Sequence, residues 1–230
     1  MQISPVRFFI DVPGSGAVDA ALIAPDSAPP QALFVFAHGA GAGMRHAFMV
    51  QLSVALMQRG IATLRFQFPY MQQQSRRPDR PEVAQSAVRA AVSAARERMP
   101  GVPLFAGGKS FGGRMTSGAQ ASEPLEGVNG IVFVGFPLHP PKDPGIARAA
   151  HLDQVKVPML FLQGTRDELA GLALIREVTA ALGMRATLHV VEGGDHSFDV
   201  LVRSGRTAEQ VMAELADTAA QWMGAQRVSA

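Results

Sequence analysis

The pentapeptide Gly108-Lys109-Ser110-Phe111-Gly112 has the pattern Gly-x-Ser-x-Gly, which can present a serine hydroxyl for nucleophilic attack. An apolar run typical of a strand, residues 104–107, comes directly before it, and a helical pattern over residues 111–121 begins within it. In this strand–turn–helix order the serine lies at the tip of a sharp turn. The glycines on both sides let the strand and the helix approach each other closely. The sequence therefore predicts Ser110 as a nucleophile.

A serine hydroxyl needs a base that removes its proton and an acid that orients the base. Asp167 follows the predicted strand 159–163, and His196 follows the predicted strand 188–191. The order serine, acid, histidine along the chain is the order expected for a serine in this kind of turn. All three side chains leave the carboxyl edge of one predicted sheet and can meet there. We predict Ser110, Asp167 and His196 as the catalytic residues.

Two neighbouring carboxylates, Glu168 and Asp195, are rivals for the role of the acid. Adjacent residues at a strand end point in different directions, so only one carboxylate can reach the histidine. We favour Asp167 because the turn after the strand begins there. Among the other histidines, His38 follows a predicted strand and is expected to brace a loop by hydrogen bonds. The remaining ones are expected to be structural, surface or pocket-lining residues: His46, His139, His151 and His189.

The stretch His-Gly-Ala-Gly-Ala-Gly, residues 38–43, follows another predicted strand and offers backbone N–H groups that side chains do not cover. Such donors could stabilise an oxyanion. One is expected from the residue after the nucleophile, Phe111, and one from this loop, Ala40. A phosphate-binding loop is the alternative function for both glycine-rich stretches. It is disfavoured because the glycine that such a loop requires five residues before Gly108 is Pro103.

Two segments, 69–80 and 137–156, interrupt the alternation of strands and helices, and both follow strand ends, where open sheets bind ligands. Arg76, Arg77 and His139 lie in them and are the candidate substrate-binding residues. Guanidinium groups would suit a substrate that carries a carboxylate or phosphate. Alternatively, these arginines only solvate a polar loop or pair with nearby carboxylates.

Apolar runs typical of strands alternate with helical patterns along the chain. We predict an α/β fold: a single domain over residues 1–230, with a mostly parallel central sheet, helices on both faces, an antiparallel pair at one edge and no separate cap domain. The expected strands are 6–12, 20–24, 33–37, 61–66, 104–107, 131–136, 159–163 and 188–191. The expected helices are 47–59, 81–99, 111–121, 172–182 and 208–224.

Composition excludes several classes of protein. The chain has 230 residues, 47% of them hydrophobic and 17% charged, which excludes a disordered protein. It has no cysteine, so neither a disulfide framework nor a thiolate nucleophile is expected. A net charge of +2 without a long basic stripe gives no reason to expect nucleic acid as a partner. Without a signal peptide or an apolar run long enough to span a bilayer, we expect a cytoplasmic protein with no membrane partner.

Taken together, these residues resemble the α/β-hydrolase superfamily. The chain is similar in particular to small, lid-poor bacterial hydrolases grouped with testis-expressed and histone-acetyltransferase-complex relatives, near dienelactone hydrolase. The matching stretches are His-Gly-Ala-Gly-Ala-Gly, Arg65-Phe-Gln-Phe-Pro-Tyr70, Gly-Lys-Ser-Phe-Gly-Gly-Arg and Phe136-Pro-Leu-His-Pro-Pro141. The resemblance covers residues 33–222. Dienelactone hydrolase uses a cysteine nucleophile, so its substrate does not carry over.

The motifs and the resemblance together predict a serine hydrolase that cleaves a carboxylic ester or related acyl bond of a small molecule through an acyl-enzyme. Such chemistry needs neither a metal nor an organic cofactor. Three alternatives stay open: a non-catalytic binding or scaffold subunit, a triad enzyme that transfers acyl groups, and one that cleaves peptides. The sequence gives no indication of the oligomeric state.

Overall fold

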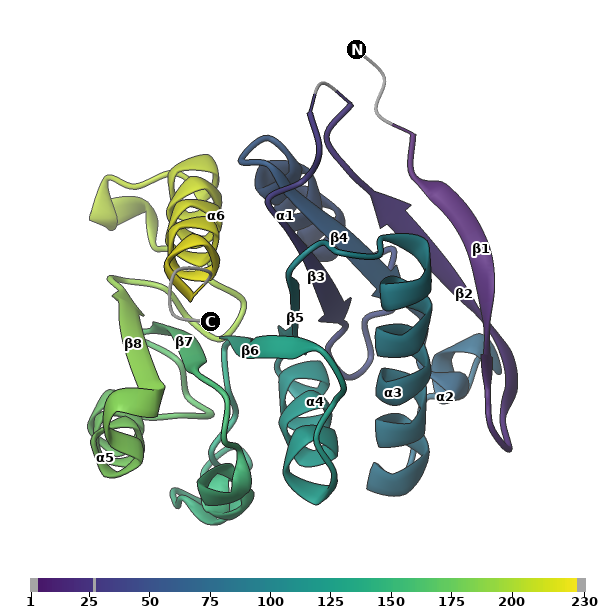
Figure 1. Ribbon diagram of the computed structural model, residues 1–230. Helices are drawn as coiled ribbons and strands as arrows, with labels where there is room; N and C mark the ends of the chain where they lie inside the picture. Colours follow the sequence, from purple (N-terminus) through teal and green to yellow (C-terminus); the bar gives the residue numbers. More distant parts are fainter. Residues whose placement is uncertain (1–3, 27, 227–230) are drawn as a thin grey trace.

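The central element of the molecule is one mixed β-sheet, which lies between two layers of helices in Figure 1. The computed structural model describes residues 4–26 and 28–226, so the first three and last four residues of the predicted domain lie outside it. Within this part of the chain the sheet has eight strands in the order β1-β2-β4-β3-β5-β6-β7-β8. They are β1 (Val6–Val12), β2 (Gly16–Ile23), β3 (Ala32–Ala37), β4 (Ile61–Phe66), β5 (Leu104–Lys109), β6 (Val128–Val134), β7 (Met159–Gly164) and β8 (Ala186–Val191).

Strand direction follows the sequence pattern. β1 pairs antiparallel with β2, and β2 pairs antiparallel with β4. The other six strands, β3 to β8, are all parallel to one another. Every residue of β3, β4 and β7 is buried, as expected for strands covered on both faces. Edge strand β1 has mostly exposed or half-buried residues. The predicted parallel sheet with an antiparallel pair at one edge is confirmed.

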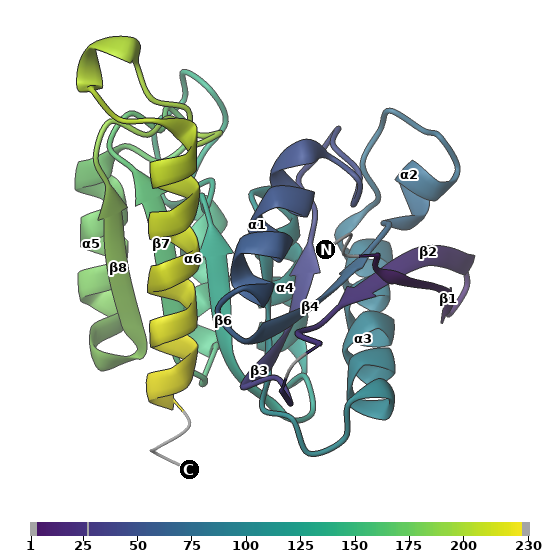
Figure 2. The same ribbon diagram turned by 90° about the horizontal axis from the view of Figure 1, so that it is seen from above.

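Helices cover both faces of the sheet and enclose two hydrophobic cores. Helices α1 (Ala47–Met57) and α6 (Ala208–Ala225) lie side by side on one face (Figure 2). The opposite face carries α3 (Pro81–Arg98), α4 (Phe111–Ser122) and α5 (Leu172–Leu182), as Figure 1 shows. The shorter helices are α2 (Pro69–Gln72), η1 (Ala147–Gln154), η2 (Gly183–Arg185) and η3 (Val202–Ser204).

Local sequence explains where the long helices begin and end. Pro81 starts α3, where its missing N–H costs nothing. Thr207 and Gln210 form a reciprocal capping box at the start of α6. Helix α5 ends at Gly183, whose φ of 61° suits glycine. The five predicted helices are therefore all present.

The structure differs from the sequence-based expectations in a few places. β2 begins at Gly16 rather than at residue 20, because a tight turn around Gly14 joins it directly to β1. β6 spans Val128–Val134 and ends before the predicted residue 136, because Gly135 has a φ of 72°. The two irregular segments are not wholly irregular, since α2 and η1 form within them.

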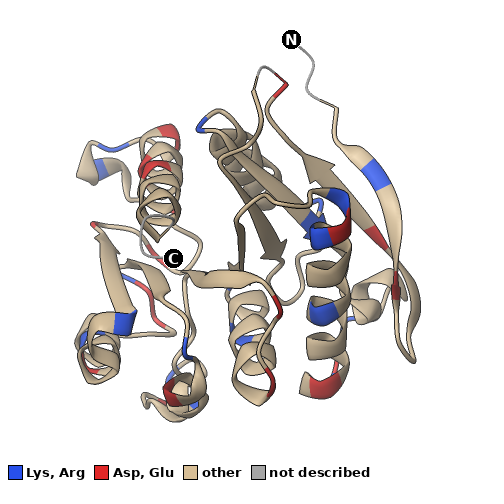
Figure 3. Ribbon diagram, in the orientation of Figure 1, with Lys and Arg blue, Asp and Glu red and all other residues tan. Residues whose placement is uncertain are grey.

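The charged side chains are dispersed over the molecule. Figure 3 shows Lys and Arg interspersed with Asp and Glu on helices of both layers. Among the helices that the structure describes, none combines the length and apolar character needed to cross a bilayer. The polar groups discussed below gather instead at the carboxyl edge of the parallel strands.

Candidate active site

Ser110 lies in a strained turn between β5 and α4. Its φ of 49° and ψ of −112° are a conformation that residues with a side chain rarely adopt. The turn is tight because two glycines pack against neighbouring backbone. A Cβ atom added to Gly108 or to Gly112 would lie 2.4 Å from the Ala37 carbonyl oxygen. Only glycine fits at these two positions, which explains the Gly-x-Ser-x-Gly pattern.

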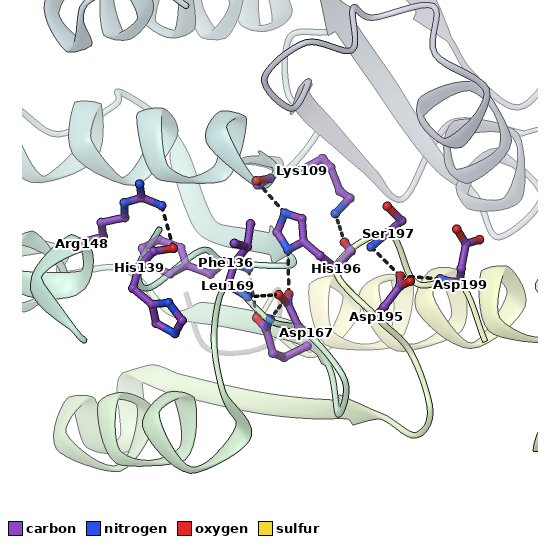
Figure 4. A network of polar contacts seen from close by, with 12 residues as sticks. Lys109, Phe136, His139, Arg148, Asp167, Leu169, Asp195, His196, Ser197 and Asp199 are labelled. Carbon is purple, nitrogen blue, oxygen red and sulfur yellow. Dashed lines mark hydrogen bonds and ion pairs between the residues drawn. The ribbon is translucent and has the colours of Figure 1, made fainter. Parts of the chain in front are cut away.

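A continuous chain of hydrogen bonds joins the three predicted catalytic side chains. His196 Nε2 lies 2.9 Å from Ser110 Oγ, and His196 Nδ1 lies 2.8 Å from Asp167 Oδ2. With a proton on Nδ1, the imidazole donates to Asp167 and accepts from the serine hydroxyl. The Asp167 side chain is 0% exposed, whereas that of His196 is 25% exposed. Figure 4 shows His196 pointing toward Asp167 from its loop after β8.

Two further donors hold the Asp167 carboxylate. Gln163 donates through Nε2 to Asp167 Oδ2 at 2.5 Å, and the Leu169 N–H donates to Oδ1 at 2.8 Å. The rival Glu168 is exposed. The other rival, Asp195, accepts hydrogen bonds from backbone N–H groups within its own loop. Of the three candidate acids, the structure thus places Asp167 against His196.

The loops that carry Asp167 and His196 are joined by direct backbone contact. A Cβ atom on Gly164 would lie 2.2 Å from the Gly194 carbonyl oxygen. The Arg166 N–H donates to the same oxygen at 2.8 Å. The Gly193 N–H donates to Thr165 Oγ1, also at 2.8 Å. The two loops therefore form one packed unit.

The two predicted oxyanion donors lie beside Ser110. Gly39 packs against the serine, since an added Cβ atom would lie 3.8 Å from the Ser110 Cβ, within van der Waals contact. Ala40 follows it and lines the same cavity as Ser110. Within the described residues, the Ala40 N–H donates no hydrogen bond. Phe111 is the first residue of α4, where an N–H has no acceptor within the helix.

His38 joins the glycine-rich loop to the segment after β4 by hydrogen bonds. Its Nδ1 lies 2.8 Å from the Gly39 carbonyl oxygen, and its Nε2 accepts from the Phe68 N–H at 3.0 Å. This pair of bonds requires a neutral imidazole with the proton on Nδ1. Burial lowers the pKa of His38 to about 4, in agreement with a neutral ring. His38 thus has the bracing position predicted for it.

The end of β4 and the segment after it hydrogen-bond to the same loop and to the residue that follows it. Arg65 Nη1 donates to the Met44 carbonyl oxygen at 2.8 Å, and Gln67 Oε1 accepts from the Met44 N–H at 2.9 Å. The Gly41 N–H donates to the Tyr70 hydroxyl at 3.1 Å. These bonds give the Arg-Phe-Gln-Phe-Pro-Tyr stretch a physical role: it fixes the loop that carries Ala40.

Lys109, the neighbour of the nucleophile, connects β5 to the histidine loop. Its Nζ donates to the His196 carbonyl oxygen (Figure 4). The same ammonium lies 5.7 Å from the centre of the Phe48 ring and 5.2 Å from that of Phe198. Burial is the largest influence on its pKa and lowers it from 10.5 to about 8, although nearby carboxylates, among them Asp167, act in the opposite direction.

A second serine–histidine pair lies elsewhere, in the packing between α4 and η1. Ser117 Oγ lies 2.7 Å from His151 Nε2. Ser117 is fully buried within the helix, and its hydroxyl also donates to the Arg114 carbonyl oxygen. Neither residue lines the cavity described next, and among the described residues no carboxylate pairs with His151. This pair therefore lacks both the acid and the access that Ser110 has.

A cavity of about 870 Å³ opens beside Ser110 and His196 and extends between the N-terminal ends of α1 and α6. The predicted substrate-binding residues Arg76, Arg77 and His139 are not among its lining residues. The two arginines lie exposed after α2 and before α3. His139 is buried, and its Nδ1 lies 2.8 Å from the Pro140 carbonyl oxygen. In Figure 4 its ring lies apart from that of His196.

Sequence reasoning did not single out Gln163 or the contact of Lys109 with His196. Gln163 had a detectable signal, since it is a polar residue at the end of the otherwise apolar strand β7. The Lys109 contact had none, because it depends on where the histidine loop folds. Residues 4–26 and 28–226 contain no group of three or more metal-ligating side chains placed to hold an ion.

Known proteins share the fold of this chain. A family model described as an alpha/beta hydrolase domain matches residues 30–224. The structure of dienelactone hydrolase from Anabaena variabilis is similar, with a TM-score of 0.75, 20% identity, and coverage of 96% of this chain and 97% of the other. XC6422 from Xanthomonas campestris, described as an α/β serine hydrolase without a lid, has a TM-score of 0.74, 20% identity and 96% coverage of both chains. Est1E from Butyrivibrio proteoclasticus has a TM-score of 0.73, 16% identity, and coverage of 96% of this chain and 99% of its own.

Proposed function

The chain belongs to the alpha/beta hydrolase family, and we propose on this basis that it is a serine hydrolase that cleaves a carboxylic ester or a related acyl bond of a small molecule. One observation carries the proposal. A serine in a strained turn lies 2.9 Å from an imidazole nitrogen, and the other nitrogen of that ring lies 2.8 Å from a buried carboxylate. A purely structural serine has no need for this combination of strain and polar partners.

In the first half of the proposed reaction, Ser110 Oγ attacks the carbonyl carbon of the ester while its proton passes to His196 Nε2. The carbonyl electron pair moves to oxygen, and the N–H groups of Ala40 and Phe111 stabilise the oxyanion. Asp167 accepts from Nδ1–H and stabilises the imidazolium that has formed. The C–O bond then breaks, and the proton on Nε2 passes to the leaving alcohol.

In the second half, water attacks the acyl group bound to Ser110. His196 now removes a proton from the water, and the same backbone donors hold the second oxyanion. Collapse of this intermediate returns the proton to Ser110 Oγ and releases the carboxylic acid. The strained turn supports both halves, because it holds Oγ at the start of α4, where the positive end of the helix dipole favours negative charge.

A fluorophosphonate probe tests the proposal, because it forms a covalent bond only with an activated serine. We expect the wild-type protein to be labelled and to hydrolyse p-nitrophenyl acetate. Ser110→Ala should abolish the labelling and lower kcat by about 10⁶-fold. An unlabelled wild-type protein would support the non-catalytic binding or scaffold alternative instead.

The second serine–histidine pair supplies a matched control. Ser117→Ala removes a hydroxyl that also contacts a histidine but lies outside the cavity, so labelling and turnover should persist. Loss of labelling in Ser117→Ala with retention in Ser110→Ala would overturn the assignment. Adding alcohols or short peptides to the assay separates acyl transfer and peptide cleavage from hydrolysis.

A further inference from the structure

We propose that the cavity between α1 and α6 binds an uncharged, apolar group of the ester substrate, either an aliphatic chain or an aromatic ring. This inference rests on the proposed function and names the class of substrate that the site would take. It differs from the anionic substrate that Arg76 and Arg77 suggested. The cavity, rather than the arginine-containing segment, adjoins Ser110 and His196.

The inner walls of the cavity are apolar. Met49 of α1, Phe198 of the histidine loop, and Val211 and Leu215 of α6 line it, and all four are at most 4% exposed to solvent. The half-buried Met212 completes the α6 wall. Transfer of an apolar group from water to such walls lowers the free energy of binding in proportion to the apolar area that is covered. The cavity volume lies within the range of pockets that enclose small organic ligands.

The charged groups around the cavity disfavour an anionic ligand. Asp199 and Glu209 lie exposed at its rim and would repel an approaching anion. The one lysine among the lining residues, Lys109, already donates to the His196 carbonyl oxygen and lies near several carboxylates. The faces of two aromatic rings, those of Phe48 and Phe198, also surround its ammonium.

The cavity reaches from the apolar walls to the reacting atoms. Ser110, His196 and the oxyanion loop residue Ala40 line one end, whereas Met212 and Leu215 line the α6 side. A substrate whose carbonyl lies at Ser110 can therefore extend an apolar group along α6. Full burial of each methylene corresponds to a gain of about fourfold in binding of the transition state. Substrate length should thus control kcat/KM until the cavity is full.

Two series of esters test the proposal. The first lengthens the acyl group, from p-nitrophenyl acetate through butyrate and hexanoate to decanoate, and the second lengthens the alcohol in alkyl acetates. We expect kcat/KM to rise in at least one series by up to about fourfold per methylene and then to level off. Met212→Trp should lower kcat/KM for the longer substrates of that series by at least about tenfold relative to acetate.

Gln221→Trp is the control, because it adds the same ring at an exposed position of α6 and should leave the profile unchanged. The proposal is overturned if both series are flat or fall from the shortest member, or if Met212→Trp slows short and long substrates equally. A preference for p-nitrophenyl hydrogen succinate over its neutral methyl ester would also overturn it, in favour of an anionic substrate. Fluorophosphonate labelling of Ser110 in the same samples shows that such failures leave the proposed function intact.

Discussion

Replacing Lys109 with methionine should affect stability and activity in opposite directions. The substitution keeps an unbranched side chain of similar length and removes the ammonium that contacts the His196 carbonyl oxygen. Burial lowers the pKa of Lys109 from 10.5 to about 8, so the fold disfavours the charged form even with its hydrogen bond and aromatic neighbours. This difference in pKa corresponds to about 3 kcal/mol.

The sign of the pH effect follows from proton binding. Between about pH 8 and pH 10.5 the unfolded chain holds a proton on Lys109 that the folded protein has released. The contribution of this lysine to the free energy of unfolding therefore rises with pH across that window. The methionine side chain of the variant cannot titrate, so Lys109→Met should be at least as stable as the wild type near neutral pH and should lack this part of the rise.

Activity should respond differently, because the ammonium fixes the loop that carries the catalytic imidazole. We expect Lys109→Met to lower kcat/KM by about tenfold through misplacement of His196, and Lys109→Arg to restore part of the loss. Urea unfolding of both proteins at about pH 7 and pH 10 measures the stability term, and ester hydrolysis measures the activity. An equal pH dependence of stability in the two proteins, or unchanged kcat/KM in Lys109→Met, would refute this reasoning.

Two further predictions concern the acid and the arginines. Asp167→Asn should lower kcat by about 10⁴-fold because an amide favours the wrong tautomer of His196, whereas Glu168→Gln should retain wild-type kcat; the reverse result would identify Glu168 as the acid. The double variant Arg76→Ala, Arg77→Ala should leave kcat/KM for both neutral and carboxylated esters within about twofold of the wild type, since neither side chain lines the cavity; a selective loss on carboxylated esters, suppressed by salt, would contradict this.

The order of strands and helices could be predicted because each central strand is a short apolar run with a helical pattern after it. Ser110 and His196 could be proposed from the same pattern, since Ser110 directly follows β5 and His196 lies in the loop after β8. The choice of Asp167 over Glu168 could be argued only from the direction of a turn. The structure distinguishes them through the contact between Asp167 and His196, which lie 29 residues apart in the chain.

The cavity lay beyond sequence reasoning, because its walls come from α1, α6 and the histidine loop, which are distant in the chain. Arg76 and Arg77 were proposed as substrate-binding residues because they follow a strand that ends at the site. The two arginines do not line the cavity: α2 forms between β4 and the arginines, and the chain then continues to α3. Helix α6 had no recognisable motif, yet it supplies one wall of the proposed substrate cavity.

The backbone contact between Gly164 and Gly194 has a consequence for thermal motion at the site. Asp167 and His196 lie in two loops that contact each other directly, at the ends of β7 and β8, whereas Ser110 follows β5, with β6 between them. We therefore expect thermal motion of the sheet to change the distance between His196 Nε2 and Ser110 Oγ more than the distance between Asp167 and His196. The distance across which the proton passes therefore depends on how β5 and the histidine loop are held together. The hydrogen bond from Lys109, the neighbour of Ser110, to the His196 carbonyl oxygen links these two parts directly.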